Sequence, residues 1–117
     1  MTTALTTRDR RGLVLKSSIQ QLADEIVRKF HPRKIILFGS YVGGEATPDS
    51  DVDLLVVLQP GRRGVTSLRI RRAIDYRFAL DLIVLTAGKF CERLKESDFF
   101  LLDIVEQGIV LYEEDNG

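Results

Sequence analysis

Cysteine is scarce in this sequence, which has only one, Cys91, among its 117 residues. A single cysteine excludes an intramolecular disulfide, and it leaves no cysteine cluster that could hold zinc. Both exclusions fit a protein that is kept in a reducing compartment. We therefore expect a cytoplasmic protein.

Long hydrophobic runs are also missing. No apolar stretch approaches the roughly 18 residues that a membrane-spanning helix needs. The first residues, 1–12, lack the apolar segment of a secretory signal. We expect neither a membrane span nor a secretory leader.

An excess of one charge is absent as well. The 17 Lys and Arg residues are balanced by 17 Asp and Glu residues, for a formal net charge of +0 at pH 7. No overall positive field therefore attracts nucleic acid or an anionic membrane. The one dense basic stretch, residues 62–77, is interpreted as a solvated loop and helix face in preference to a contact for RNA or an acidic partner. Direct nucleic-acid binding is not expected.

The composition is that of an ordinary globular protein, with 44% hydrophobic and 29% charged residues. A chain of this length forms one domain with a genuine core but is too short for two domains. The pattern of apolar residues places that domain at residues 12–113. We expect residues 1–11 and 114–117 to be flexible termini.

Apolar residues recur at helical spacing from Ser18 to Phe30, and Pro32 then ends the predicted helix. The rest of the pattern predicts strands at 34–38, 51–58, 78–86 and 109–113, a helical turn within 40–46, and helices at 65–77 and 89–107. The strands at 51–58 and 78–86 are expected to be buried, and the strand at 109–113 is expected at an edge. The predicted fold is an α/β domain, with a mixed β-sheet of about four strands flanked by helices.

The most informative stretch joins Gly39 and Ser40, ten further residues, and the pair Asp51 and Asp53 at the start of a buried strand. Residues two apart on a strand point to the same face, about 6.5 Å apart along the chain. Two carboxylates at that spacing offer the hard oxygen ligands that Mg²⁺ prefers. A pair of metal ions about 3.5–4 Å apart would fit between them.

Gly39 and Ser40 lie where a strand gives way to a helical turn. A residue without Cβ lets a phosphate approach the backbone, and the Ser40 hydroxyl adds a hydrogen-bond donor. Other phosphate-binding motifs are absent. Taken alone, each half of the pattern is better interpreted as an ordinary turn or a capped loop. Together they favour a site for a nucleoside triphosphate.

A third carboxylate, Asp81, lies near the start of the next predicted strand. If this strand lies beside the strand of Asp51, the Asp81 side chain can face the same metal ions. It would then serve as a metal ligand or as a base toward an attacking hydroxyl. The alternative is an ordinary aspartate at the end of an edge strand.

The stretch GSYVGGEATPDSDVDLLVVL resembles the signature of the DNA polymerase β-type nucleotidyltransferase superfamily, and the short chain resembles its minimal nucleotidyltransferases. The resemblance implies the fold of that superfamily. It also implies that Gly39 and Ser40 bind the triphosphate of ATP, that Asp51 and Asp53 hold two Mg²⁺ ions, and that Asp81 is the third metal-binding acid. One departure is Gly43, where relatives often have a basic residue.

The function implied by this resemblance is Mg²⁺-dependent transfer of AMP, or another nucleoside monophosphate, from the triphosphate to a hydroxyl. For the minimal family, the expected acceptor is a tyrosine of a HEPN-type toxin, and the chain would act as its antitoxin. The run from Phe99 to Leu102 has more apolar surface than one helix can bury, so we expect a protein partner and a hetero- or homo-oligomer. The alternatives are a weakly catalytic module that masks such a partner and an enzyme that modifies a small molecule such as an antibiotic.

Overall fold

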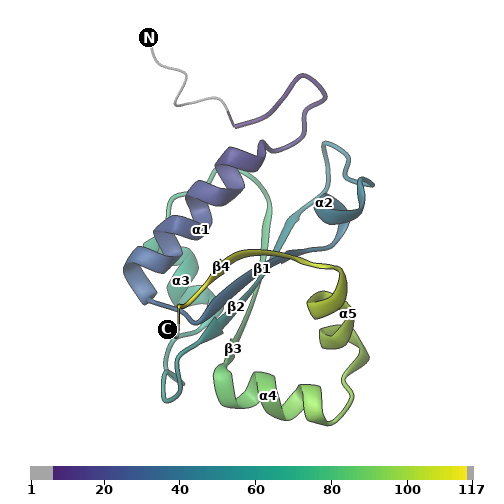
Figure 1. The fold of residues 1–117 in the computed structure, drawn as a ribbon. Coiled ribbons are helices and arrows are strands. Elements are labelled where there is room, and N and C mark those ends of the chain that lie inside the picture. The colour runs from purple at the N-terminus through teal and green to yellow at the C-terminus, as the bar shows by residue number, and fades with distance from the viewer. Residues whose placement is uncertain (1–6, 116–117) are drawn as a thin grey trace.

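The computed structural model describes residues 7–115 of the chain, which contain five helices and four strands. Figure 1 shows their arrangement. In chain order the elements are α1 (Lys16–Phe30), β1 (Lys34–Phe38), α2 (Ser40–Gly43), β2 (Val52–Leu58), α3 (Ser67–Ala73), β3 (Leu80–Thr86), α4 (Ala87–Lys95), α5 (Phe99–Gln107) and β4 (Ile109–Glu113).

The four strands form one sheet in the order β3-β2-β1-β4. Strand β1 runs antiparallel to both β2 and β4, whereas β2 and β3 are parallel. A right-handed crossover is the usual connection between parallel neighbours, and here α3 lies in the segment that joins β2 to β3. The predicted α/β fold with a mixed, four-stranded sheet is confirmed.

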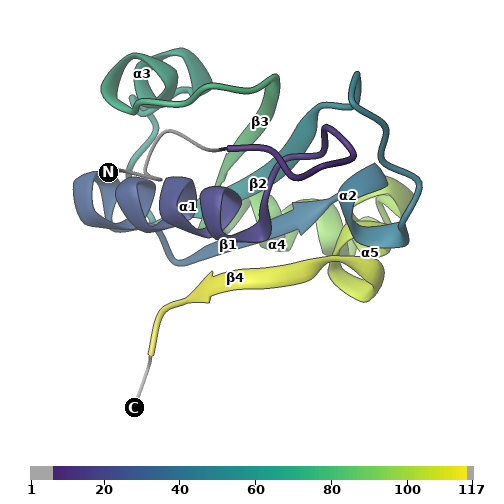
Figure 2. The same cartoon turned by 90° about the horizontal axis from the view of Figure 1, so that it is seen from above.

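Helices cover both faces of the sheet. Figures 1 and 2 show α1 and α3 on one side and α4 and α5 on the other. Alternating strand residues divide between the two cores: Leu37 and Leu54 pack with α1 and α3, whereas Ile36 and Leu55 pack with α4 and α5. Strand β2 is buried on both faces after Asp53, as the apolar run of its sequence predicts. Its face toward α4 and α5 is the one that carries the candidate site.

Two predictions about the second half of the chain are wrong. The helix predicted over 89–107 is two helices, because Ser97 has a left-handed φ of 60° and Asp98 caps α5 by accepting from the backbone N–H of Leu101. The Arg93 guanidinium holds the Asp98 carboxylate at 2.8 Å, which fixes the bend between α4 and α5. Strand β3, which was expected to be buried, lies at an edge of the sheet, and only its first part is buried.

Backbone hydrogen bonds link the residues at the start of the described chain. The backbone N–H of Leu15 donates to Thr7 O at 2.8 Å, and the N–H of Asp9 donates to Leu13 O at 2.8 Å. Residues 7–15 therefore form a hydrogen-bonded turn, which we call the N-terminal turn. At the other end, the Glu114 N–H donates to Arg33 O. The other residues of the expected flexible termini, 1–6 and 116–117, lie outside the described residues, and Asp115 is the last described residue.

None of the helices within residues 7–115 has the length and apolar character that crossing a bilayer requires.

Candidate active site

The three acidic residues singled out in the sequence gather at one end of the β2–β3 pair. Asp53 is the second residue of β2, and its Cα is the direct register partner of Asp81 in β3. Neighbouring strands lie about 4.8 Å apart, so the two backbones place these side chains next to each other on the same face of the sheet. Asp51 immediately precedes the strand. The predicted proximity of Asp81 to the Asp51–Asp53 pair is confirmed, and their roles as ligands stay predictions.

Burial and like charge act together on Asp53. The side chain is partly buried, whereas Asp51 and Asp81 are exposed. Desolvation, followed by the charges of Asp81 and Asp51, raises the pKa of Asp53 to about 6. The three carboxylates therefore repel one another, and a bound cation would relieve that repulsion.

The chemistry of this donor set fits Mg²⁺, which accepts carboxylate oxygens together with water and substrate phosphates. In the described part of the chain, however, no three His, Cys, Asp or Glu side chains converge closely enough to enclose a metal ion by themselves. The acids supply part of a coordination shell. Phosphate oxygens of a substrate and water would have to supply the rest.

Gly39 joins the end of β1 to α2 in a conformation that only glycine adopts readily, with φ 83° and ψ −154°. A Cβ added at this residue would overlap the Oδ2 atom of Asp53. Because Gly39 has no side chain, the Asp53 carboxylate can occupy this space. Ser40 follows as the first residue of α2 and is partly buried. The two halves of the sequence motif thus meet in space.

Gly43 stands where relatives often have a basic residue. It is the last residue of α2 and lies beside the acidic side chain of Glu45. A Cβ at Gly43 would overlap the Oε1 atom of Glu45. The segment from Ser40 to Glu45 contains no Lys or Arg, so it brings no cation to the triphosphate that the motif predicts.

The sequence singles out Phe99 and Phe100 as part of an apolar run, but it does not show that Phe38 connects them to the acids. We call Phe38, Phe99 and Phe100 the aromatic rim. The Cα of Phe38 is the register partner of Asp53 in the antiparallel β1–β2 pair. The rings of Phe38 and Phe100 meet edge to face, with centroids 5.8 Å apart and planes at 89°. Phe100 is 50% exposed and Phe99 is 82% exposed. The apolar start of α5 therefore lies on the same side of the sheet as the acids. This placement follows from the register of β1 against β2 and could not be read from the sequence.

The raised pKa of Asp53 predicts how stability depends on pH in the absence of metal. Because the folded state binds this proton more tightly than the unfolded state, the free energy of unfolding should fall as pH rises from about 4 to about 6. Asp53→Asn cannot titrate at this position, so its free energy of unfolding should not show this fall between pH 4 and pH 6. With EDTA present, its melting temperature should exceed the parental value at pH 8 by about 4 °C, for about 1 kcal/mol after allowance for solvent exposure.

The same comparison near pH 3.5 should show no difference between the two proteins. Glu106→Gln, an exposed change near the end of α5, is the control and should leave the melting temperature unaltered at both pH values. A lower melting temperature for Asp53→Asn at pH 8 would contradict the repulsion inferred among the three acids.

Comparisons with known proteins show the family to which the chain belongs. The family model described as nucleotidyltransferase domain matches residues 19–111. A protein of Methanocaldococcus jannaschii named "Putative protein adenylyltransferase MJ0604" is 31% identical over 99 residues, which cover 83% of this chain and 97% of that protein. "Protein adenylyltransferase MntA" of Thermococcus cleftensis is 59% identical over 32 residues, or 27% of this chain and 32% of that protein.

A solved structure provides a similar fold. The crystal structure of a "putative nucleotidyltransferase" from Sulfolobus solfataricus aligns with a TM-score of 0.58 and 20% identity, covering 86% of this chain and 82% of that one. The family match includes all five residues of the predicted site: Gly39, Ser40, Asp51, Asp53 and Asp81. The chain therefore belongs to the nucleotidyltransferase domain family and is a minimal nucleotidyltransferase, as the motif in its sequence predicts.

Proposed function

We propose that the protein transfers AMP from ATP to a hydroxyl group of a partner protein, in a Mg²⁺-dependent reaction that releases pyrophosphate. The observation that carries this proposal is the register pairing of Asp53 with Asp81, beside the backbone of Gly39. This arrangement brings acidic side chains to the place where the motif predicts a triphosphate. The names of two relatives, both protein adenylyltransferases, support a protein as acceptor.

In the proposed reaction, the acceptor oxygen attacks the α-phosphorus of ATP. A bond forms between that oxygen and phosphorus, and the bond from the α-phosphorus to the bridging oxygen of the β-phosphate breaks. The hydroxyl proton passes to the exposed Asp81 carboxylate and from there to solvent. Mg²⁺ held by Asp51, Asp53 and Asp81 would neutralise charge on the phosphates. Gly39 and Ser40 would orient the triphosphate in line with the acceptor.

The aromatic rim favours a protein acceptor over a small molecule. Phe99 and Phe100 leave an apolar surface at the start of α5, and Phe38 connects it to the strand position opposite Asp53. Aromatic anchors of this kind dominate the energetics of protein interfaces. A partner seated on this rim would present a hydroxyl to the three acids. From the family resemblance, we propose a HEPN-type toxin as the partner, a tyrosine as the acceptor and neutralisation of the toxin as the outcome.

The test combines the chain, ATP, Mg²⁺ and the protein that co-purifies with the tagged chain from its native host. Mass spectrometry of intact protein and of peptides should find one AMP added to a tyrosine of the partner. A HEPN-type partner modified by the parental chain but not by Asp53→Asn would support the proposal. Transfer to a small molecule alone, or toxin neutralisation that persists in Asp53→Asn, would contradict it.

The rim predicts a separate effect on the partner. Phe99→Ser should weaken partner binding about tenfold or more, because a highly exposed aromatic anchor is lost. ATP binding should stay unchanged, since Phe99 is outside the predicted phosphate site. Leu68→Ser, at an exposed apolar residue on α3, is the matched control and should leave partner binding intact. Calorimetric titration with the partner would measure the affinities of both variants. Equal affinities for the parental chain and Phe99→Ser would exclude the rim as a partner-binding surface.

A further inference from the structure

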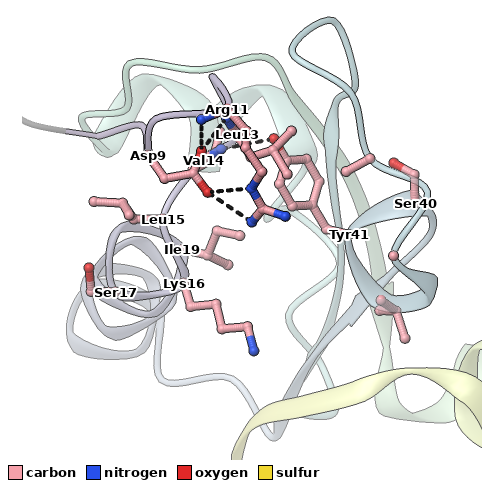
Figure 3. Close-up of a pocket in the computed structure, with 13 residues that line it drawn as sticks. Asp9, Arg11, Leu13, Val14, Leu15, Lys16, Ser17, Ile19, Ser40 and Tyr41 are labelled. Atoms are coloured by element: carbon pink, nitrogen blue, oxygen red, sulfur yellow. Dashed lines mark hydrogen bonds and ion pairs between the residues drawn. The ribbon is translucent and has the colours of Figure 1, made fainter.

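A hollow lies between the N-terminal turn, the start of α1 and α2, with a volume of about 580 Å³. We call it the N-terminal hollow. Its lining includes Ser40, so it borders the predicted phosphate site, and it also includes Arg11, Lys16 and Tyr41. Figure 3 shows the side chains of Arg11 and Lys16 reaching into the space between α1 and α2. No feature of the nucleotidyltransferase motif accounts for these two cations.

The N-terminal turn is fastened to the segment that carries the motif. The Val14 N–H donates to the hydroxyl of Tyr41 at 3.0 Å, and the Arg8 guanidinium donates to Pro48 O at 3.4 Å. Val14 is itself buried in the core that α1 shares with the sheet. The turn therefore holds its charged side chains at a defined place beside Ser40.

The charges that line the hollow sum to one positive charge, from Arg11, Lys16 and Asp9. The Asp9 carboxylate accepts from the Arg11 Nη2 atom at 2.9 Å, which orients the guanidinium. Lys16, by contrast, makes no ion pair or side-chain hydrogen bond with any other part of the described chain. Its ammonium is exposed and available to an anion.

The position of Lys16 is unfavourable for the helix that carries it. Lys16 is the first residue of α1, whose first turn contains no acidic side chain. A cation at this end opposes the helix dipole, and the same charge would stabilise the helix at its other end. The charge of Lys16 therefore does not stabilise the helix. An anionic ligand would explain why a cation stands at this position.

The motif itself lacks such a cation. Gly43 brings no charge, and the carboxylate of Glu45 lies against it. A triphosphate placed at Gly39 and Ser40 is a polyanion that extends beyond the two residues. Among the described residues that line the same hollow as Ser40, the positively charged ones are Arg11 and Lys16.

We propose that the N-terminal hollow receives the β- and γ-phosphates of the nucleotide, with Lys16 and the Asp9-oriented Arg11 as their cationic partners. This inference rests on the proposed function, because it assumes that the nucleoside triphosphate reaches Ser40. The α-phosphate lies toward Asp53, and the two outer phosphates lie across Ser40 toward α1. Pyrophosphate, the product formed from those phosphates, is expected to occupy the same hollow before it leaves.

The experiment compares ATP, AMP and inorganic pyrophosphate in calorimetric titrations with Mg²⁺ and no acceptor. Lys16→Ala should weaken ATP and pyrophosphate binding about tenfold, the effect of losing one charge-assisted contact, and should change AMP binding less than twofold. Lys16→Glu should weaken ATP binding further, and Lys16→Arg should retain most of the affinity. Lys95→Ala, at an exposed residue that ends α4, is the control and should leave all three affinities unchanged.

Equal ATP affinities for the parental chain and Lys16→Glu would overturn this inference and leave the proposed function intact. Equal losses of ATP and AMP affinity would also overturn it, because the lysine would then contact the nucleoside or the α-phosphate. A parental chain that binds no ATP would instead contradict the proposed function itself. Melting temperatures should be unchanged or slightly raised in Lys16→Ala, which excludes unfolding as the cause of a lost affinity.

Discussion

Asp53→Asn is expected to lower the rate of nucleotide transfer by about a hundredfold to a thousandfold, while the protein stays folded. The reason is that Asp53 occupies the centre of the site: its Cα is paired with Asp81 on one side and with Phe38 on the other, and its carboxylate lies against Gly39. An amide of the same shape keeps this packing but removes the negative charge. The loss is of the size seen when one electrostatic group of an active site is removed.

Asp51→Asn should have a comparable effect on transfer, since the resemblance assigns both residues to the metal ions. The measurement is single-turnover transfer of labelled AMP at several Mg²⁺ concentrations, with circular dichroism to verify folding. Glu106→Gln, at an exposed acid near the end of α5, is the control and should transfer at the parental rate. Parental rates for either Asp51→Asn or Asp53→Asn would eliminate the two-metal interpretation.

Asp81→Asn separates two interpretations of the third acid. If Asp81 serves mainly as a base, its replacement should lower the rate and flatten its dependence on pH. If it serves mainly as a ligand, higher Mg²⁺ concentrations should restore part of the rate. The exposure of Asp81 and its place on an edge strand are compatible with both roles. The alternative from the sequence is that Asp81 is an ordinary aspartate of an edge strand. In that case Asp81→Asn should not change the transfer rate.

The central part of the site is predictable from local sequence because it depends on neighbours along the chain. The apolar run after Asp53 indicates a strand buried on both faces, and an acid at the start of the next strand meets Asp53 when the two strands are parallel neighbours. The spacing from Gly39 to Asp51 then predicts the site. Burial and register in the structure agree with these inferences.

Other features escaped prediction, one because of a local backbone conformation and the others because of long-range contacts. The break between α4 and α5 depends on the positive φ of Ser97 and on the Asp98 cap, within a segment whose apolar spacing is compatible with one helix. The contact of Phe38 with Phe100 joins residues far apart in the chain. The N-terminal turn likewise includes the hydrogen bond from the Val14 N–H to the Tyr41 hydroxyl, which its polar sequence does not indicate. In the second and third cases, the contact joins residues that are distant in the sequence.

Gly39 illustrates the same limit, because its sequence context predicts a phosphate contact but not its contact with Asp53. Gly39→Ala is expected to lower both stability and nucleotide binding. The backbone at φ 83° and ψ −154° is a conformation that residues with a Cβ rarely adopt, and the strain costs about 1–3 kcal/mol. The added methyl group would also overlap Asp53 Oδ2 and push the carboxylate away from the site. Urea unfolding and ATP titration would measure the two effects.

A control and a double variant separate backbone strain from the contact with Asp53. Gly44→Ala also places a methyl group at a positive φ, 84°, but nothing lies within 4 Å of its Cβ, so it should destabilise the protein less and leave ATP binding unchanged. Asp53→Ala removes the overlapping oxygen. In the Asp53→Ala background, the destabilisation by Gly39→Ala should therefore shrink by about 1 kcal/mol, which is the coupling expected for residues in contact. If the effects of Gly39→Ala and Asp53→Ala on the free energy of unfolding are additive, the overlap between a Cβ at Gly39 and the Asp53 carboxylate does not contribute to the destabilisation.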